Sequence, residues 1–441
     1  MSSRWSRFAL AGLATAAMSA LALVAVATAA ANWFETRAQI PGLAEPVAVA
    51  RLTRAARLRP GLADTWREWA DVTSFAHPAR ARTLARRAVQ LAPTDWRNWT
   101  SLALVDYRLN HLQAASSDFA AAARVDRGAA AHLQLANMAW LVGNRNLYWN
   151  QIRLALAVCS RDQYPAILAQ VQRLNGPDTA NVLRVLPPGQ AGPVCGGVEF
   201  LCAMGHPRAA TRAWQLMPSC TSVTQWACRG AALSLAHAWL ADALHPGHQS
   251  TAVAPAIQYW NRAVAAGLLA GSASFGAITD GGFRYPWVGG LEWTSDSRVT
   301  LWRRAPDAGA GSGQAVMQLS GDQPDQSPLL WEWVPVSPGV HYRVAFQSRA
   351  DDSVTGAGLL LQVATPDGVR LTQVVAPLQP NWNSASGSFV VPDHVYLLKV
   401  GFECDRPFGA TLLRGEVSLR RVNLEAASGS DSALDSRSEH E

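Results

Sequence analysis

The sequence has little charge and almost no lysine. Charged residues make up 16% of the 441 residues, and Lys399 is the only lysine in the chain. At every position other than 399, the lack of lysine excludes a Schiff-base lysine, the lysine of a phosphate-binding loop and a Ser-Lys dyad. The patterns His-Glu-x-x-His and Gly-x-Ser-x-Gly and an EF-hand loop are also missing. The sequence therefore predicts a protein that is not an enzyme and that has no cofactor and no metal site.

The positive charge of the chain is confined to one region. Residues 51–97 contain ten arginines and four acids, which accounts for the whole net charge of +6. These arginines lie at mixed spacing in helical sequence, without the interleaved reading elements of a nucleic-acid-binding surface. We interpret them as solvated helix faces, with attraction to an anionic surface as the alternative. A nucleic-acid partner is not predicted.

The N-terminal segment, residues 1–34, predicts export. Arg4 and Arg7 precede Phe8–Ala31, 24 residues without charge, and such a run is long enough to cross a hydrocarbon core of about 30 Å. Ala27-Thr28-Ala29 also fits a signal-peptidase site, so a cleaved signal peptide is the alternative. Both interpretations place the bulk of the chain outside the cytoplasm. We expect a single-pass protein of a bacterial inner membrane, with most of the chain in the periplasm.

The chain has six cysteines, and four of them cluster. In an oxidising compartment this grouping predicts one or two disulfides, with buried free thiols as the alternative. A zinc site is not favoured, because no Cys-x₂-Cys spacing accompanies the cluster. The four candidates are Cys195, Cys202, Cys220 and Cys228.

A repeat of 33 residues follows the N-terminal segment. Pro60 and Pro93 are separated by 33 positions, and so are Trp66 and Trp99. Each copy has large apolar residues at a spacing of three to four and then a second run with small residues at its crossing points, which is typical of paired helices. A looser third copy begins near Ala129.

These residues resemble the tetratricopeptide repeat, whose pattern has W-x₂-L-G in the first helix and A-x₃-F in the second. The matching positions are Trp99, Leu102 and Ala103, then Ala115 and Phe119, with Ala103 in place of the glycine. The resemblance covers residues 44–160 and implies a helical solenoid, continued by degenerate repeats over 161–275. It also implies a groove for a protein partner. The alternative is a helical spacer.

From Leu291 the hydrophobic period changes to two, with turn signals about every ten residues. This predicts an antiparallel β-sandwich of the jelly-roll type, and the Ser/Asp/Glu-rich residues 425–441 predict a disordered tail. The fold class is therefore multidomain α + β. The expected strands are Val299–Arg303, Gln314–Leu319, Leu329–Pro335, His341–Gln347, Gly358–Ala364, Arg370–Val375, Ser386–Val391, Tyr396–Cys404 and Ala410–Val422.

Residues 282–424 resemble the galactose-binding-like jelly rolls found among carbohydrate-binding modules. The resemblance rests on the segment Val336–Ala350, on Trp382 followed by Ser388–Pro392, and on the opening Gly282-Phe283 with Gly290–Trp293. The last strand has Gly415–Arg421 where these modules often carry an Asp pair near calcium, so calcium is not expected.

The order of anchor, helical repeats and jelly roll resembles tetratricopeptide-repeat proteins that accompany bacterial envelope polysaccharide assembly. This implies a membrane-anchored accessory protein that binds envelope exopolysaccharide through the jelly roll. The alternatives are a protein-protein scaffold with a structural jelly roll and, more distantly, a glycan-active enzyme.

Strand parity indicates a polar sheet face opposite the core. We expect sugar hydroxyls to bind its charged and amide side chains, and Trp382 to stack on a sugar ring. An ordinary solvated face, or a face docked on the helices, is the alternative. The candidate glycan-binding residues are Glu332, Arg343, Gln347, Gln362, Trp382, Lys399 and Glu403.

Overall fold

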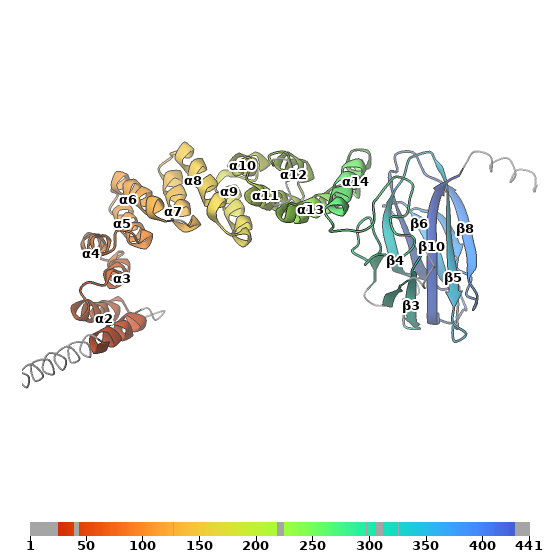
Figure 1. The fold of residues 1–441 in the computed structure, drawn as a ribbon, viewed down its shortest axis with the longest axis horizontal. Coiled ribbons are helices and arrows are strands. Elements are labelled where there is room, and N and C mark those ends of the chain that lie inside the picture. Colours follow the sequence, from red (N-terminus) through yellow and green to blue (C-terminus); the bar gives the residue numbers. More distant parts are fainter. Residues whose placement is uncertain are drawn as a thin grey trace, which may run out of the picture. The chain divides into compact units, whose positions relative to one another are not determined.

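The computed structural model describes residues 25–38, 44–126, 128–217, 225–296, 299–305, 312–324 and 326–427, with only the backbone described for 225–229. The described residues form two compact units, one within Met1–Pro187 and one within Pro188–Glu441. The first is helical, and the second combines helices with a β-sandwich (Figure 1). This confirms the expected helical region and C-terminal sandwich. The predicted domain boundaries stay predictions.

The first unit is a series of short helices. After a helix over residues 25–38 it contains α2 (Glu45–Leu58), α3 (Ala63–Thr73), α4 (Pro78–Leu91), α5 (Trp96–Arg108), α6 (Leu112–Val125), α7 (Ala129–Leu141), α8 (Arg145–Val158), the 3₁₀ turn η1 (Arg161–Gln163), α9 (Tyr164–Asn175) and α10 (Thr179–Val185).

The 33-residue repeat corresponds to the helix pairs α3/α4 and α5/α6. Trp66 Nε1 donates to Pro60 O at 2.9 Å, and Trp99 Nε1 makes the equivalent bond to Pro93 O at 2.8 Å. The same tryptophan therefore ties the start of each pair to the preceding loop. Small residues bury the seams: Ala81, Ala85, Ala88, Ala115 and Ala122 are fully buried. The expected third copy is confirmed as α7/α8, which starts at Ala129.

Most of the predicted membrane segment Phe8–Ala31 lies outside the described residues, which begin at residue 25. In the part of the chain that is described, no helix is both long enough and apolar enough to cross a membrane. The helix over residues 25–38 packs on the repeats: Ala31 is fully buried, and Arg59 Nη1 donates to Asn32 Oδ1 at 3.4 Å.

The second unit begins with helices and ends with strands. The helices are α11 (Ala191–Ala203), α12 (Pro207–Trp214), α13 (Gln225–Ala243) and α14 (Gln249–Ala265). The strands are β1 (Thr294–Ser295), β2 (Thr300–Arg304), β3 (Gln314–Ser320), β4 (Gln326–Pro335), β5 (His341–Ala350), β6 (Leu359–Ala364), β7 (Arg370–Val375), β8 (Asn383–Val390), β9 (Leu397–Asp405) and β10 (Arg414–Ala426).

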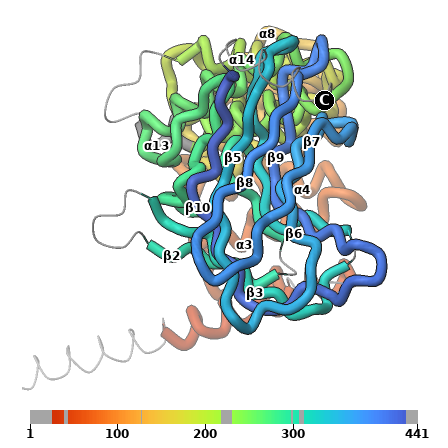
Figure 2. Tube along the Cα trace, turned by 90° about the vertical axis from the view of Figure 1, so that its right-hand side faces the viewer, coloured from red at the N-terminus to blue at the C-terminus, as the bar shows by residue number. Residues whose placement is uncertain are grey.

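Two antiparallel sheets form the sandwich. Sheet I has the order β1-β4-β9-β6-β7, and sheet II has the order β2-β3-β10-β5-β8. The four-strand orders β4-β9-β6-β7 and β3-β10-β5-β8 are those of a jelly roll. Figure 2 shows β10, β5 and β8 of sheet II side by side. The nine expected strands are confirmed as β2–β10, although β10 continues to Ala426, two residues into the predicted tail.

The sandwich core contains a row of aromatic rings. Phe283 and Trp293 have ring centroids 5.2 Å apart, Trp293 and Phe402 are 6.3 Å apart, and Phe402 and Phe346 meet edge to face at 5.1 Å. All four side chains are at most 1% exposed. Phe346 belongs to sheet II and Phe402 to sheet I, so this contact joins the two sheets across the core.

The segment between α14 and β1 packs on the sandwich. Gly276 N donates to Pro335 O at 2.7 Å, and Val422 N donates to Gly281 O at 2.8 Å. A Cβ on Gly281 would lie 1.7 Å from the carbonyl oxygen of Val422. The two backbones therefore approach too closely for a side chain at position 281. Helix α14 also contacts the sandwich, because Tyr396 N donates to Gln249 Oε1 at 2.8 Å. These contacts make α14, the segment and the sandwich one packed structure.

Candidate functional site

The structure divides the predicted glycan-binding residues among three environments. Gln362, Lys399 and Glu403 lie on the outer side of sheet I, whereas Arg343 and Gln347 lie on the outer side of sheet II. Trp382 adjoins the second group at the start of β8. Glu332 is inside the sandwich. The single polar face expected from strand parity is therefore wrong, because parity assigns a side of each strand but not the sheet to which the strand belongs.

Glu332 was expected on the solvated face and is instead fully buried. A bulge in β4 between Pro328 and Leu330 changes which side chains point inward. Leu330, Glu332 and Val334 then face the core, and Trp331 and Trp333 face outward. The error arose because apolar residues occupy both sides of this strand, so hydrophobic alternation could not identify the inner one.

The buried Glu332 carboxyl is held by the segment that precedes the sandwich. Its Oε1 accepts a hydrogen bond from Thr279 N at 3.0 Å, while Oε2 is buried and has no hydrogen-bond partner among the described residues. Burial raises the pKa of Glu332 well above its usual value, and the nearby acids Asp280 and Glu292 raise it further. Burial also raises the pKa of each of those two acids.

We expect Glu332 to make the protein less stable as the pH rises. An acid with a raised pKa binds more protons in the folded state, so the free energy of unfolding falls from the ordinary pKa of 4.5 upward. Each pH unit between the unfolded and folded pKa values costs about 1.4 kcal/mol. Glu332→Gln keeps an acceptor for Thr279 N and does not titrate, so it should be more stable than the parent at pH 8.

The measurement is denaturant unfolding of the parent and Glu332→Gln between pH 5 and pH 8. Glu403→Gln is the matched control, because Glu403 is at the surface and 3.8 Å from Lys399 Nζ. Equal pH slopes for the parent and Glu332→Gln would contradict the assignment.

The outer side of sheet I forms what we call the Trp331 face, made up of Trp331, Trp333, Gln362, Gln373, Lys399 and Glu403. Its strands are in register, so Trp331, Gly401, Gln362 and Gln373 form one row across four strands. A Cβ on Gly401 would lie 2.6 Å from Trp331 Cβ, so Trp331 packs directly beside this glycine and leaves no room for a side chain there. The row thus places an aromatic side chain, the glycine that it packs against and two side-chain amides in line.

Polar groups share this face with the Trp331 ring. Gln373 Nε2 donates to Gln362 Oε1 at 3.1 Å, and Lys399 Nζ lies 5.1 Å from the ring centroid and 3.8 Å from Glu403 Oε1. Trp333 stands beside Lys399 in the next row. Half-buried indoles next to amides and a charge pair provide both an apolar surface and hydrogen-bonding groups. The sequence-based expectation placed Glu332 on the side of β4 opposite the core; this puts its neighbours Trp331 and Trp333 on the core side, so both tryptophans were missed as candidates.

The outer side of sheet II forms the Arg420 face, made up of Arg343, Gln347, Arg349, Ser384, Ser386 and Arg420 together with Trp382. Arg420 Nε donates to Gln347 Oε1 at 2.8 Å, and Gln347 Nε2 donates to Ser384 Oγ at 3.1 Å. Arg343 Nη2 donates to Ser386 Oγ at 3.0 Å. The structure thus brings Arg343 and Gln347 together as expected, and it adds Arg349 and Arg420.

Trp382 does not stand free for a sugar ring. The guanidinium carbon of Arg420 lies 4.0 Å from its ring centroid, and that of Arg349 lies 5.1 Å away. The ring therefore supports two arginines. The sequence held a signal for Arg349, because this residue continues the outward alternation of Arg343 and Gln347 along the same strand.

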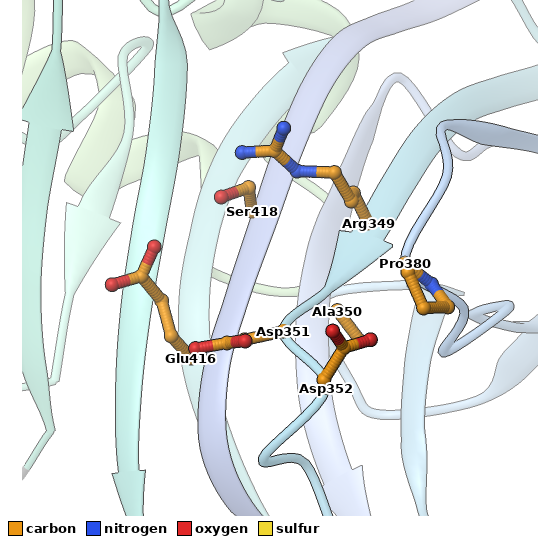
Figure 3. A pocket seen from close by; sticks show the side chains of 7 residues that line it. All are labelled: Arg349, Ala350, Asp351, Asp352, Pro380, Glu416 and Ser418. Atoms are coloured by element: carbon orange, nitrogen blue, oxygen red, sulfur yellow. The ribbon is translucent and has the colours of Figure 1, made fainter.

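A cavity of about 200 Å³ adjoins Arg349 (Figure 3). Arg349 borders one end above Ser418, and the carboxylates of Asp351, Asp352 and Glu416 surround the other. Glu416 is paired with Arg304 at 3.3 Å. In the described part of the chain, no group of three or more His, Cys, Asp or Glu residues has the arrangement of a metal site.

The cysteine cluster is only partly described. Burial raises the pKa of Cys202, a free thiol among the described side chains, to about 12. Cys195 Sγ lies 3.3 Å from Met217 Sδ. Cys220 lies outside the described residues, as does the side chain of Cys228. A disulfide in this cluster stays a prediction.

No family model and no curated protein matches the chain. Among solved structures, the chain is similar to PilW, a widely conserved type IV pilus biogenesis factor, with 19% identity over 42% of this chain and 91% of that chain (TM-score 0.30). It is also similar to a CBM4 structure, with 16% identity over 34% and 99% (TM-score 0.27), and to the CBM22-1 xylan-binding domain of Paenibacillus barcinonensis Xyn10C, with 12% identity over 35% and 99% (TM-score 0.25).

Proposed function

We propose that this protein is a non-catalytic accessory protein of the bacterial envelope that binds a polysaccharide through the Trp331 face of its jelly roll. The observation that carries the proposal is the row Trp331, Gly401, Gln362 and Gln373, in which an indole packed beside a glycine lies in line with two side-chain amides. Sugar rings present apolar faces and equatorial hydroxyls, and such a row offers a partner to each. Lys399 and Glu403 compensate each other, so the face suits an uncharged sugar.

The other parts of the chain fit the same role. An anchor over Phe8–Ala31 would hold the protein at the inner membrane with the jelly roll in the periplasm. The helical repeats would bind a protein partner, and Phe75 is a candidate contact because it is 80% exposed under the guanidinium of Arg108. A protein-protein scaffold with a purely structural jelly roll is the second candidate function, favoured by this exposed ring.

Binding of the full-length protein to an array of bacterial envelope polysaccharides tests the proposal. We expect retention of neutral polysaccharides with micromolar affinity, and competition between a soluble oligosaccharide and the immobilised polymer. The full chain is required because residues 271–281 and α14 contact the sandwich. No binding to any polysaccharide, together with capture of a defined envelope protein by the helical repeats, would instead support the scaffold.

A further inference from the structure

The three arginines of the Arg420 face and the adjacent Arg421 form no ion pair with a carboxylate of the described residues. Elsewhere in the sandwich Arg284 lies 3.7 Å from Asp280, Arg304 lies 3.3 Å from Glu416, and Arg370 lies 3.6 Å from Asp405. Among the described residues, no such ion pair forms at Arg343, Arg349, Arg420 or Arg421. Glu425 stands opposite Arg343 in the register, but its carboxylate bonds to Asn423.

Arg420 is held in a fixed orientation. Nε donates to Gln347 Oε1 at 2.8 Å, and the guanidinium carbon lies over the Trp382 ring, 4.0 Å from its centroid. Within the described part of the chain, neither terminal nitrogen of Arg420 donates to a protein acceptor. A guanidinium fixed by its Nε and by stacking presents its two terminal groups as a preorganised fork for a carboxylate. Burial lowers the pKa of Arg420, and the charges of Arg421 and Arg349 lower it further, as expected where like charges are not compensated.

We propose that Arg349, Trp382 and Arg420 form a clamp that binds the carboxylate groups of an acidic polysaccharide. This is a second site, on the opposite sheet from the Trp331 face and with a different ligand chemistry. The two arginines bind the carboxylate, Trp382 positions them, and the serine hydroxyls and the Gln347 amide bind neighbouring sugar hydroxyls. The carboxylates of Asp351, Asp352 and Glu416 disfavour an anion in the cavity that adjoins Arg349. The acidic group of the ligand therefore sits at the other end of the clamp, beside Arg420.

The surroundings of the clamp favour a glycan over other anionic polymers. The outward residues of β8 beside it are Ser384, Ser386 and Ser388, which provide hydroxyl groups and no apolar surface for the core of a protein interface. The guanidinium groups of Arg420 and Arg349 both lie over the Trp382 ring, 4.0 and 5.1 Å from its centroid, so they compete with stacking of a nucleic-acid base.

The test compares polygalacturonate with its fully methyl-esterified form, which has the same backbone without charge. We expect the full-length protein to bind polygalacturonate at least tenfold more tightly than the ester. Arg420→Gln should reduce polygalacturonate binding by tenfold or more and leave binding of the ester unchanged. Arg420→Lys should restore only part of the affinity, because an ammonium group lacks the planar fork.

Arg370→Gln is the matched control, since it removes the same charge from sheet I, and it should leave polygalacturonate binding within twofold of the parent. Arg349→Gln provides a second variant if Arg420→Gln lowers the melting temperature. Equal affinity of the parent for both polymers would overturn the proposal, and so would equal loss in Arg370→Gln. Tighter binding of single-stranded DNA or of anionic lipid vesicles would overturn it as well. Binding of a neutral polysaccharide by a Trp331 variant tests the Trp331 face. Its result does not change what the polygalacturonate experiment shows about the clamp.

Discussion

Trp331→Ala is expected to weaken binding of a neutral polysaccharide by at least an order of magnitude. The indole is half-buried on the outer side of sheet I beside Gly401, so truncation removes the apolar surface of the proposed site. Loss of an aromatic side chain at the centre of a binding site typically costs about 2 kcal/mol or more. The effect should appear in the dissociation constant measured by calorimetric titration of the full-length protein with the best polysaccharide from the array.

The control for this variant is Trp302→Ala. Trp302 is also half-buried and on an outer side, but it belongs to β2 of sheet II, opposite Val316. Its truncation should leave the affinity within twofold of the parent. If Trp331→Ala binds as tightly as the parent while its melting temperature is preserved, the Trp331 face is not the site and the proposed function loses its support.

Phe346→Ala is expected to destabilise the sandwich by about 3–5 kcal/mol, the usual cost of truncating a buried phenylalanine. The ring is 1% exposed and meets Phe402 of the other sheet at 5.1 Å, so its loss opens a cavity between the two sheets. Scanning calorimetry of the full-length protein should show a lower melting temperature for one transition.

Val375→Ala is the surface control for Phe346→Ala. Val375 is 72% exposed on the edge strand β7, where substitutions usually change stability by less than about 0.5 kcal/mol. A shift of similar size in both variants would contradict the core position of Phe346. Phe346→Ala should lower stability and Trp331→Ala should lower affinity, because Phe346 faces inward and Trp331 faces outward.

The sequence by itself determined the local structure of this protein. Trp66 and Trp99 are separated by 33 positions and have the same neighbours, so the repeat of helix pairs was readable before any contact was known. Alternation of apolar and polar residues in 341–347 placed Tyr342, Val344 and Phe346 on the core side, and all three are buried. These features depend on residues within one element or on a fixed period, and short-range patterns record both.

Only the tertiary structure decided how the strands combine into sites. Arg343 and Lys399 both point away from the core, yet they lie on opposite sheets, because the jelly-roll order places β5 and β9 in different layers. In β4 a single bulge turned Glu332 inward and Trp331 outward. Pairing between strands far apart in sequence fixes the sheet, the register and the side that is buried. The alternation of apolar and polar residues within a strand is the same whichever sheet the strand joins. A pattern of period two therefore cannot show which strands share a face.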